Sequence, residues 1–282
     1  MLNKVPYFTS NGIKYLDNNE IESMFKYTNE SEKLYHFTNF DSFVKIWLSK
    51  KLKLSNRYRM NDIAEKFDMI SGNDTTKMQA YLYAISEYKQ LSLSKKISYN
   101  AIEIYKSPLM WGIYANNATG VCIEFNKDDL ISNTNNMHYN DITYCDYIPN
   151  NSLIEDLDSH NILSIDDARC FVDKNLENIY FRKSAEWKFE NEFRIISRRQ
   201  DFLNIKNSIT CLYLFDSDLE TKEMIYNLVG SECDIKIVYL SSIFKTERIL
   251  DTFPLRKEFL KEPSINNDKF KIMLENDTKK NF

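Results

Sequence analysis

The residues best suited to chemistry lie in the segment 183–196, which reads KSAEWKFENEFRII. Successive side chains of a strand point to opposite faces, so a strand here would place Glu190, Glu192 and Arg194 in one charged row. The apolar pair 195–196 indicates that the strand continues into the core. Charged side chains on a partly buried strand are usually paired or functional. The alternative is an amphipathic strand at the surface.

A second candidate is the histidine of the segment 33–38, KLYHFT. On a strand, His36 and Thr38 share one face, and Tyr35 and Phe37 lie on the other face. Polar side chains at the end of a strand, just before a helix, are well placed to hold a ligand. A structural histidine satisfied by a hydrogen bond is the alternative.

Two further groups contain polar or aromatic residues near predicted helix ends. Asn61 and Asp62 precede Glu65, a pattern that either caps a helix or contributes to a site. Trp111 and Tyr114 are three residues apart in PLMWGIYA, so they share a helix face. These two side chains either pack in the core or offer an aromatic platform to a planar ring.

The composition excludes several common kinds of site. The chain of 282 residues has only five glycines, at positions 12, 72, 112, 120 and 230, which rules out a Rossmann fingerprint and a P-loop. Three histidines and five dispersed cysteines without a C-x-x-C pair argue against zinc ribbons and disulfide frameworks. No stretch approaches the roughly 20 apolar residues of a membrane span, and the N-terminus lacks a signal-peptide core. We therefore expect a cytoplasmic protein without a membrane partner.

Charge is distributed unevenly along the chain. The net charge is −4, yet residues 45–59 carry six Lys and Arg and no acidic residue. Such a run either forms an ordinary solvated face or lies near a site for a polyanionic ligand.

The periodicity of the sequence predicts short strands and several helices. The expected strands are 34–37, 52–55, 121–125, 142–147, 192–197, 211–215 and 235–240. The expected helices are 40–48, 76–92, 108–116, 165–181, 218–229 and 255–277. This order favours an α+β fold, a mixed sheet of short strands with flanking helices. We expect a single domain over 1–282, with a core at 33–240, an N-terminal extension at 1–32 and a helical C-terminal tail at 241–282.

Four motifs taken in order resemble a bacterial family known as domain of unknown function 2971. They are LYHFT, NDxxE, MWGIYA with GVCIEF, and KSxxWKFENEFRII, and the family's versions are similar to LYHYT, NDPFE, MWAHYA with GVCIEF, and a lysine followed by WKYEKEWR. The resemblance spans roughly residues 33–240. This chain departs from it at Ile63-Ala64, which replace Pro-Phe, and at Gly112-Ile113, where Ala-His is common. The Cys-Phe-Ser that usually precedes the third motif is also missing.

A second, weaker resemblance is to ADP-ribosyltransferase-like folds, which open on a strand with His-x-Thr and use a late Glu-x-Glu. It implies that His36 and Thr38 orient NAD, that Glu192 is the catalytic carboxylate, and that Glu190 activates the acceptor or water. Trp111 or Tyr114 would stack on the nicotinamide ring. The expected NAD-binding set is His36, Thr38, Asn61, Asp62, Trp111, Tyr114 and Arg194.

The resemblance implies an NAD-dependent ADP-ribosyltransferase or NAD glycohydrolase, of the kind found among bacterial toxins and anti-phage effectors. NAD would be the substrate, no metal would be needed, and a protein or nucleic acid could be the acceptor. Two other classes stay open. Asp62, Glu65, Glu190, Glu192 and Lys188 could form the carboxylate–lysine, Mg²⁺-binding site of a nuclease, which EDTA would inhibit. A non-catalytic module for nucleic acid or protein would use the basic run and bind in a salt-sensitive way.

Overall fold

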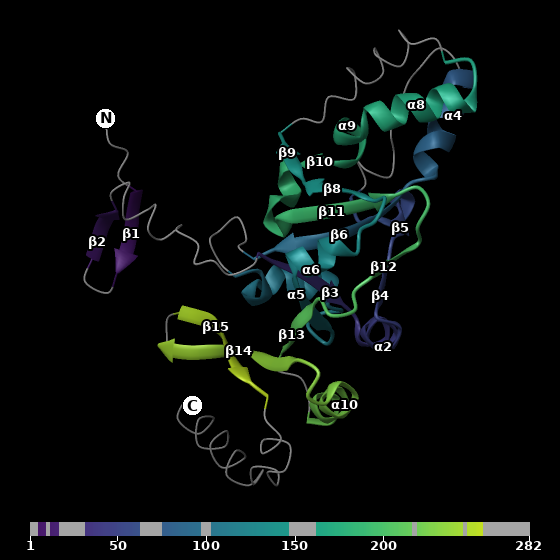
Figure 1. Ribbon diagram of the computed structural model, residues 1–282. Helices are drawn as coiled ribbons and strands as arrows, with labels where there is room; N and C mark the ends of the chain where they lie inside the picture. Colours follow the sequence, from purple (N-terminus) through teal and green to yellow (C-terminus); the bar gives the residue numbers. More distant parts are fainter. Residues whose placement is uncertain are drawn as a thin grey trace, which may run out of the picture. The chain divides into compact units, whose positions relative to one another are not determined.

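The computed structural model describes residues 5–9, 12–16, 32–62, 75–96, 103–146, 162–215, 219–244 and 247–255. Contacts divide the chain into two compact units, Met1–Glu32 and Lys33–Phe282. The described part of the first unit is an antiparallel hairpin of β1 (Val5–Thr9) and β2 (Gly12–Leu16). All further elements belong to the second unit (Figure 1).

The second unit is built on a mixed sheet of nine strands. Its order is β15-β14-β13-β7-β3-β6-β11-β8, and β5 also pairs with β6. Only β13 and β14 run parallel, and the other neighbours are antiparallel. The strands of this sheet are β3 (Lys33–Thr38), β5 (Ser55–Asn56), β6 (Lys89–Lys95), β7 (Val121–Asn126), β8 (His138–Asp141), β11 (Glu192–Ser197), β13 (Ile209–Phe215), β14 (Asp234–Phe244) and β15 (Glu247–Pro254).

Two small ribbons lie outside this sheet. Strand β4 (Lys51–Lys53) pairs with β12 (Phe202–Asn204) antiparallel, and β9 (Thr143–Cys145) pairs with β10 (Arg182–Ser184) parallel. The helices are α2 (Phe40–Ser49), α4 (Thr75–Ser86), α5 (Pro108–Tyr114), α6 (Lys127–Ser132), α8 (Ile165–Lys174), α9 (Leu176–Tyr180) and α10 (Leu219–Val229). Three short 3₁₀ helices complete the unit: η1 (Arg57–Arg59), η2 (Ile104–Lys106) and η3 (Ala185–Glu190).

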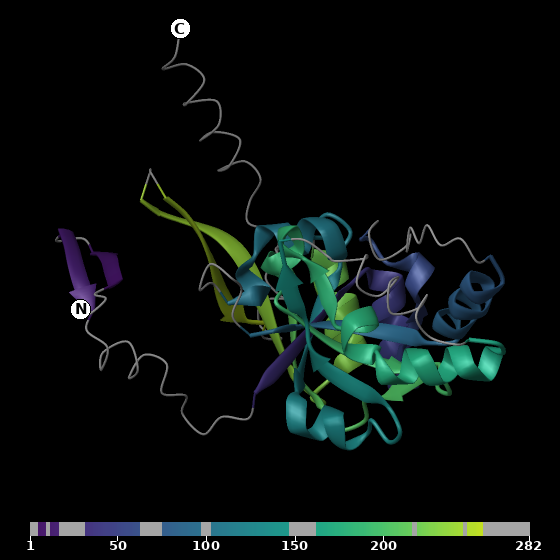
Figure 2. The same cartoon turned by 90° about the horizontal axis from the view of Figure 1, so that it is seen from above.

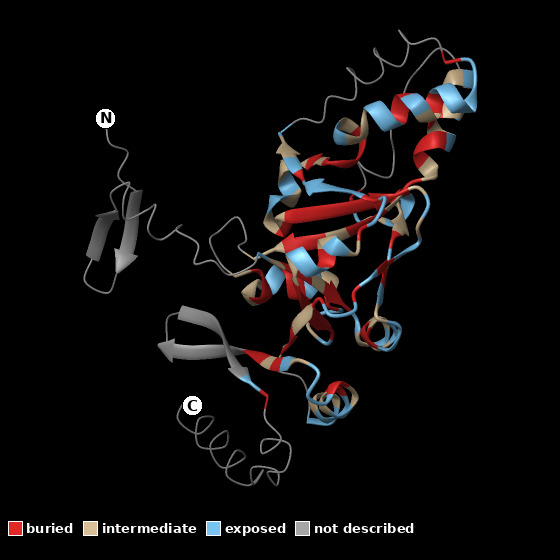
Figure 3. Ribbon diagram, viewed as in Figure 1, coloured by how far each residue is buried: buried red, intermediate tan, exposed pale blue. Residues whose placement is uncertain are grey.

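Helices α4 and α8 pack on each other beside β11 and β8, and the β14–β15 hairpin forms the opposite end of the sheet (Figure 2). The buried apolar residues form three clusters: the first between the sheet and α2, the second beneath α4 and α8, and the third around Trp111. Strand β11 is buried along its whole length (Figure 3). Its Phe193 and Ile195 enter the first cluster, while Ile196 enters the second. The predicted α+β class with a mixed sheet and flanking helices is confirmed.

Local signals explain the best-predicted elements. Asn39 caps α2 by accepting a hydrogen bond from the Ser42 N–H at 2.8 Å. Gly230, at φ +59°, ends α10 in the left-handed region where glycine carries no penalty. Among the described residues, no helix is long and apolar enough to cross a membrane.

Three expectations need correction. The helix predicted for 76–92 ends at Ser86, and 89–95 form the inner strand β6, in which Leu91 and Leu93 alternate with serines. The tail expected to be helical from 241 continues strand β14 and then forms β15. The helix predicted for 255–277 lies outside the described residues except for residue 255.

Candidate functional site

A gap in the sheet creates the site. Strand β3 pairs with β6 only at Leu34–Lys95 and Tyr35–Ser94, and β5 pairs with the far end of β6 at 89–90. Within the described chain, residues 91–93 therefore have no ladder partner on this edge, although β11 pairs with residues 89–94 on the other edge. The side chain of His36 enters the gap and hydrogen-bonds the backbone of Ser92.

A pocket opens at this gap and brings several strands and α5 together. It encloses about 820 Å³ of empty space, including the part open to solvent. Its walls come from β3, β6, α5, β10, the end of η3, the start of β11, and the segment 53–61. The lining residues are Tyr35, His36, Phe37, Lys53, Ser55, Arg59, Met60, Asn61, Gln90, Leu91, Ser92, Leu93, Ser94, Met110, Tyr114, Lys183, Glu190 and Glu192.

Five of the predicted site residues line this one pocket although they are far apart in the sequence. They are His36, Asn61, Tyr114, Glu190 and Glu192. The gap between β3 and β6 is what brings the first strand of the unit and the start of β11 to the same cavity.

The other four predicted residues do not line the pocket. Thr38 is buried and pairs with Val121 in the β3–β7 ladder. Trp111 is 1% exposed, donates its indole N–H to the Tyr105 carbonyl at 2.7 Å, and packs in the third cluster. Of the two alternatives for Trp111, it therefore packs in the core and offers no platform to a ligand. Asp62 is buried beside Asn61 without lining the pocket, and Arg194 is buried under Glu192.

A buried lysine joins the two glutamates. The Lys183 Nζ lies 2.5 Å from Glu190 Oε2 and 3.2 Å from Glu192 Oε2. Lys183 comes from β10, which pairs with β9, and its Nζ also lies 4.8 Å from the ring centre of Trp187. Two carboxylates and two cations, counting Arg194, therefore form one compact group whose formal charges cancel.

Glu192 is a fixed anion. Its Oε1 accepts from Arg194 Nε at 2.6 Å and from the Ser92 hydroxyl at 2.6 Å, and its Oε2 accepts from Arg194 Nη2 at 3.0 Å in addition to Lys183. These contacts use the four acceptor positions of a carboxylate. Burial by itself would raise the pKa of Glu192, but Arg194 and Lys183 outweigh it and lower the pKa to about 2.

Glu190 has the opposite character. It ends η3, and Asn191 turns the chain through the left-handed region (φ 44°) before β11 begins. The prediction that Glu190 lies on the strand is therefore wrong. Burial raises the pKa of Glu190, against the attraction of Lys183. The Tyr114 hydroxyl donates a hydrogen bond to Glu190 Oε1. Neighbouring carboxyls with separated pKa values are the usual arrangement for a pair with different catalytic roles.

His36 is neutral at physiological pH. Burial lowers its pKa to about 4, and the hydrogen bond to the Ser92 backbone counters this only in part. Because one ring nitrogen donates to a carbonyl oxygen, the other nitrogen is an acceptor. The ring can therefore accept a hydrogen bond from a hydroxyl group in the pocket.

The pocket mouth is basic. Lys53 and Arg59 are exposed, and together with Ser55 they line both this pocket and an adjoining depression next to Lys89 and Asp201. Neither Lys53 nor Arg59 forms an ion pair within the described part of the chain. Two cations without acidic partners fit the phosphate oxygens of a ligand.

Two members of the predicted Mg²⁺ set, Glu190 and Glu192, line the pocket. Lys188 is exposed on η3 and does not line the pocket, and Glu65 lies outside the described residues. Over the described ranges, no group of three or more His, Cys, Asp or Glu is arranged to hold a metal ion. Lys183 and Arg194 already occupy the oxygens of the two glutamates that do meet.

The helical layer holds Arg194 from behind. Arg194 Nη1 donates to the Tyr180 carbonyl at the end of α9 at 2.7 Å, and the Tyr180 hydroxyl donates to the Ile85 carbonyl in α4 at 2.6 Å. The Tyr180 ring packs against Tyr88, with 5.1 Å between ring centres.

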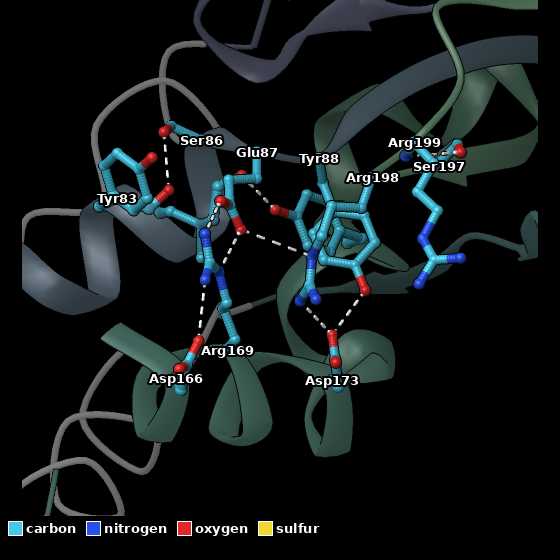
Figure 4. Close-up of polar contacts among 12 residues, drawn as sticks. Tyr83, Ser86, Glu87, Tyr88, Asp166, Arg169, Asp173, Ser197, Arg198 and Arg199 are labelled. Carbon is cyan, nitrogen blue, oxygen red and sulfur yellow. Dashed lines mark hydrogen bonds and ion pairs between the residues drawn. The ribbon is translucent and has the colours of Figure 1, made fainter. Parts of the chain in front are cut away.

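A charged network then joins the end of β11 to α8 (Figure 4). Asp173 accepts hydrogen bonds from the Tyr88 hydroxyl at 2.6 Å and from Arg198 at 2.5 Å, and Glu87 pairs with Arg169 of α8 and with Arg198. The carboxylate of Glu192 is held by Arg194, and Arg194 is bound to Tyr180 of the second apolar cluster. These contacts fix the position of the carboxylate.

Comparison with protein families identifies part of the chain. Residues 110–195 match the model of a family described as protein of unknown function (DUF2971). Over this segment the chain is similar to the DUF2971 family. The match confirms the family prediction, over a shorter range than expected. The DUF2971 segment includes Tyr114 and the whole group of Lys183, Glu190, Glu192 and Arg194. No curated protein and no solved structure matches the chain.

Sequence reasoning missed two residues of this site, Ser92 and Tyr144, and the role of a third, Lys183. Lys183 stands at the position of the lysine in the family motif, but only the turn at Asn191 shows that it lies between both glutamates. Ser92 was hidden by the helix predicted over 76–92, although alternating serines and leucines in KQLSLSK are typical of a strand. Tyr144, whose hydroxyl accepts from the Glu192 N–H at 2.8 Å, had no sequence signal.

Proposed function

We propose that this pocket binds NAD and cleaves the bond between nicotinamide and ribose, passing ADP-ribose to a macromolecule or to water. The observation that carries the proposal is that His36 and Glu192 line the same cavity. They come from β3 and β11, and the resemblance to ADP-ribosyltransferase-like folds assigns NAD binding and catalysis to these two positions.

The separated states of the two glutamates support the chemistry. When the C1′–N bond breaks, its electron pair goes to the nicotinamide nitrogen, and the ribose becomes an oxocarbenium ion. A carboxylate that stays ionised stabilises this cation, which is the role proposed for Glu192 with its pKa of about 2. The attacking hydroxyl or water then loses a proton, and Glu190, whose pKa burial raises, accepts it.

The remaining pocket residues suit the other parts of NAD. The free nitrogen of His36 can accept a hydrogen bond from a ribose hydroxyl. Tyr114, held by its hydrogen bond to Glu190, offers a ring for nicotinamide to stack on. Arg59 at the mouth can pair with the diphosphate. Asn61 lines the wall between them. No metal takes part in this scheme.

The ADP-ribosyltransferase-like fold class and a role as a bacterial toxin or anti-phage effector are part of the same proposal. Both rest on the resemblance of His36, Thr38 and the Glu190-Asn191-Glu192 sequence. NAD is an intracellular cofactor, so the proposed activity fits action in the cytoplasm.

The experiment is incubation of the purified protein with NAD, with and without EDTA, followed by separation of the products. We expect nicotinamide to appear at the same rate in both samples. ADP-ribose free in solution would indicate hydrolysis, and ADP-ribose attached to added protein or nucleic acid would indicate transfer. An absence of nicotinamide under all these conditions would refute the proposal.

A further inference from the structure

The small ribbon of β4 and β12 exposes one face with an unusual composition. Lys53 pairs with Phe202 and Lys51 pairs with Asn204, and all four of these side chains are exposed. The residues between them, Leu52 and Leu203, are both buried in the first core cluster. The strand alternation therefore fixes two lysines, an aromatic ring and an amide on the same outer face, which we call the β4–β12 face.

The β4–β12 face begins at the mouth of the pocket. Lys53 belongs to it and also lines the pocket and the adjoining depression, together with Arg59. Asp201, the nearest acidic residue in sequence to Phe202, is paired with Lys89 and so does not neutralise Lys51 or Lys53. Phe202 is 49% exposed, so its ring is accessible to a ligand on this face.

We infer that the β4–β12 face holds a single-stranded nucleic acid and leads it to the pocket mouth. Lysines spaced along a strand pair with successive phosphates, and an exposed aromatic ring stacks on an unpaired base. Asn204 adds a donor and an acceptor for a base edge or sugar. Duplex nucleic acid keeps its bases stacked inside, so Phe202 has no partner there. The nucleic acid would be the ADP-ribose acceptor, and this part of the inference rests on the proposed function. Binding of the nucleic acid does not depend on that function and is tested separately.

The probe is a labelled oligonucleotide of about 12 nucleotides, as DNA and as RNA, titrated with the full chain at about 50 and 200 mM salt. We expect at least one of the two to bind, and binding to weaken steeply with salt. Lys51→Gln should lower the slope of log affinity against log salt by about 0.7. Phe202→Ala should weaken binding by about fivefold to 150-fold.

The variants are chosen to keep the pocket intact. Neither Lys51 nor Phe202 lines it, so nicotinamide release from NAD without an acceptor should not change. Lys174→Gln, an exposed lysine on α8, and Tyr139→Ala, a 44% exposed aromatic on β8, are the matched controls and should bind normally. Thermal unfolding verifies that each variant is folded.

The inference is overturned if neither oligonucleotide binds, if the control variants weaken binding as much, or if a duplex or polyglutamate binds equally well. Equal binding of a duplex would show that the face recognises charge alone. Equal binding of polyglutamate would indicate an acidic protein as the partner. Oligonucleotide binding without NAD cleavage would support this inference and refute the proposed function. NAD cleavage without oligonucleotide binding would support the proposed function and refute this inference.

Discussion

Replacing Lys183 with methionine tests whether the two glutamates depend on one buried cation. The Lys183 Nζ contacts Glu190 at 2.5 Å and Glu192 at 3.2 Å, and its side chain is only 7% exposed. Glu192 retains Arg194 in the variant, so Glu190 is the group left without a cation. Removing one partner of a buried pair costs about 3–5 kcal/mol.

The loss should depend on pH because Glu190 can escape it by taking up a proton. The ordinary pKa of this carboxyl is 4.5. Each pH unit above that value adds about 1.36 kcal/mol to the cost of holding the proton, which gives about 5 kcal/mol at pH 8 and about 1 kcal/mol at pH 5. The variant adopts the less costly state. We therefore expect Lys183→Met to lose about 3–5 kcal/mol relative to the wild type at pH 8 and about 1 kcal/mol at pH 5.

Urea unfolding followed by circular dichroism measures these differences. Adding Glu190→Gln to Lys183→Met should restore most of the stability lost at pH 8, because the uncompensated charge is removed. Lys174→Met on the exposed surface of α8 is the control and should change little. A loss below about 1 kcal/mol at pH 8 would refute the reasoning, as would an equal loss at both pH values.

Two further predictions concern buried titratable groups. Because the pKa of His36 is about 4 in the folded protein and 6.5 in the unfolded chain, only the unfolded chain takes up this proton between those values. The free energy of unfolding should then fall with falling pH, by about 3 kcal/mol more in the wild type than in His36→Gln. Urea unfolding at several pH values measures this, and the same pH dependence in both proteins would contradict the prediction. Burial raises the pKa of the Cys122 thiol, whereas Cys170 is exposed. A thiol reagent at about pH 8 should therefore label Cys170 at once and Cys122 only after unfolding, and mass spectrometry of peptides will show whether Cys122 reacts in the folded state.

Local patterns predicted much of the fold. The strand at 33–38, the helix capped by Asn39 and the alternation of Glu192 and Arg194 with Phe193 all depend on neighbours in sequence. The strand β6 was missed because the residues before it have a helical pattern that was extended too far. The strand β15 exists through its pairing with β14, which single-sequence periodicity does not register.

The site was only partly predictable for a physical reason. Residue types singled out His36, Glu190 and Glu192, but the pocket itself results from β3 and β5 pairing with opposite ends of β6. Such a gap is a long-range property of the sheet. The role of Lys183 likewise depends on the left-handed turn at Asn191, which folds Glu190 back toward it.

The release of nicotinamide from NAD tests the central claim most directly. The wild type should release it, and Glu192→Gln should do so at least about 100-fold more slowly, as expected when one preorganised electrostatic group is removed. Glu186→Gln changes an exposed glutamate of η3, the 3₁₀ helix that precedes β11, and should leave the rate unchanged. Thermal unfolding measured on both variants will check that they are folded. Equal rates for the wild type and Glu192→Gln would contradict the account.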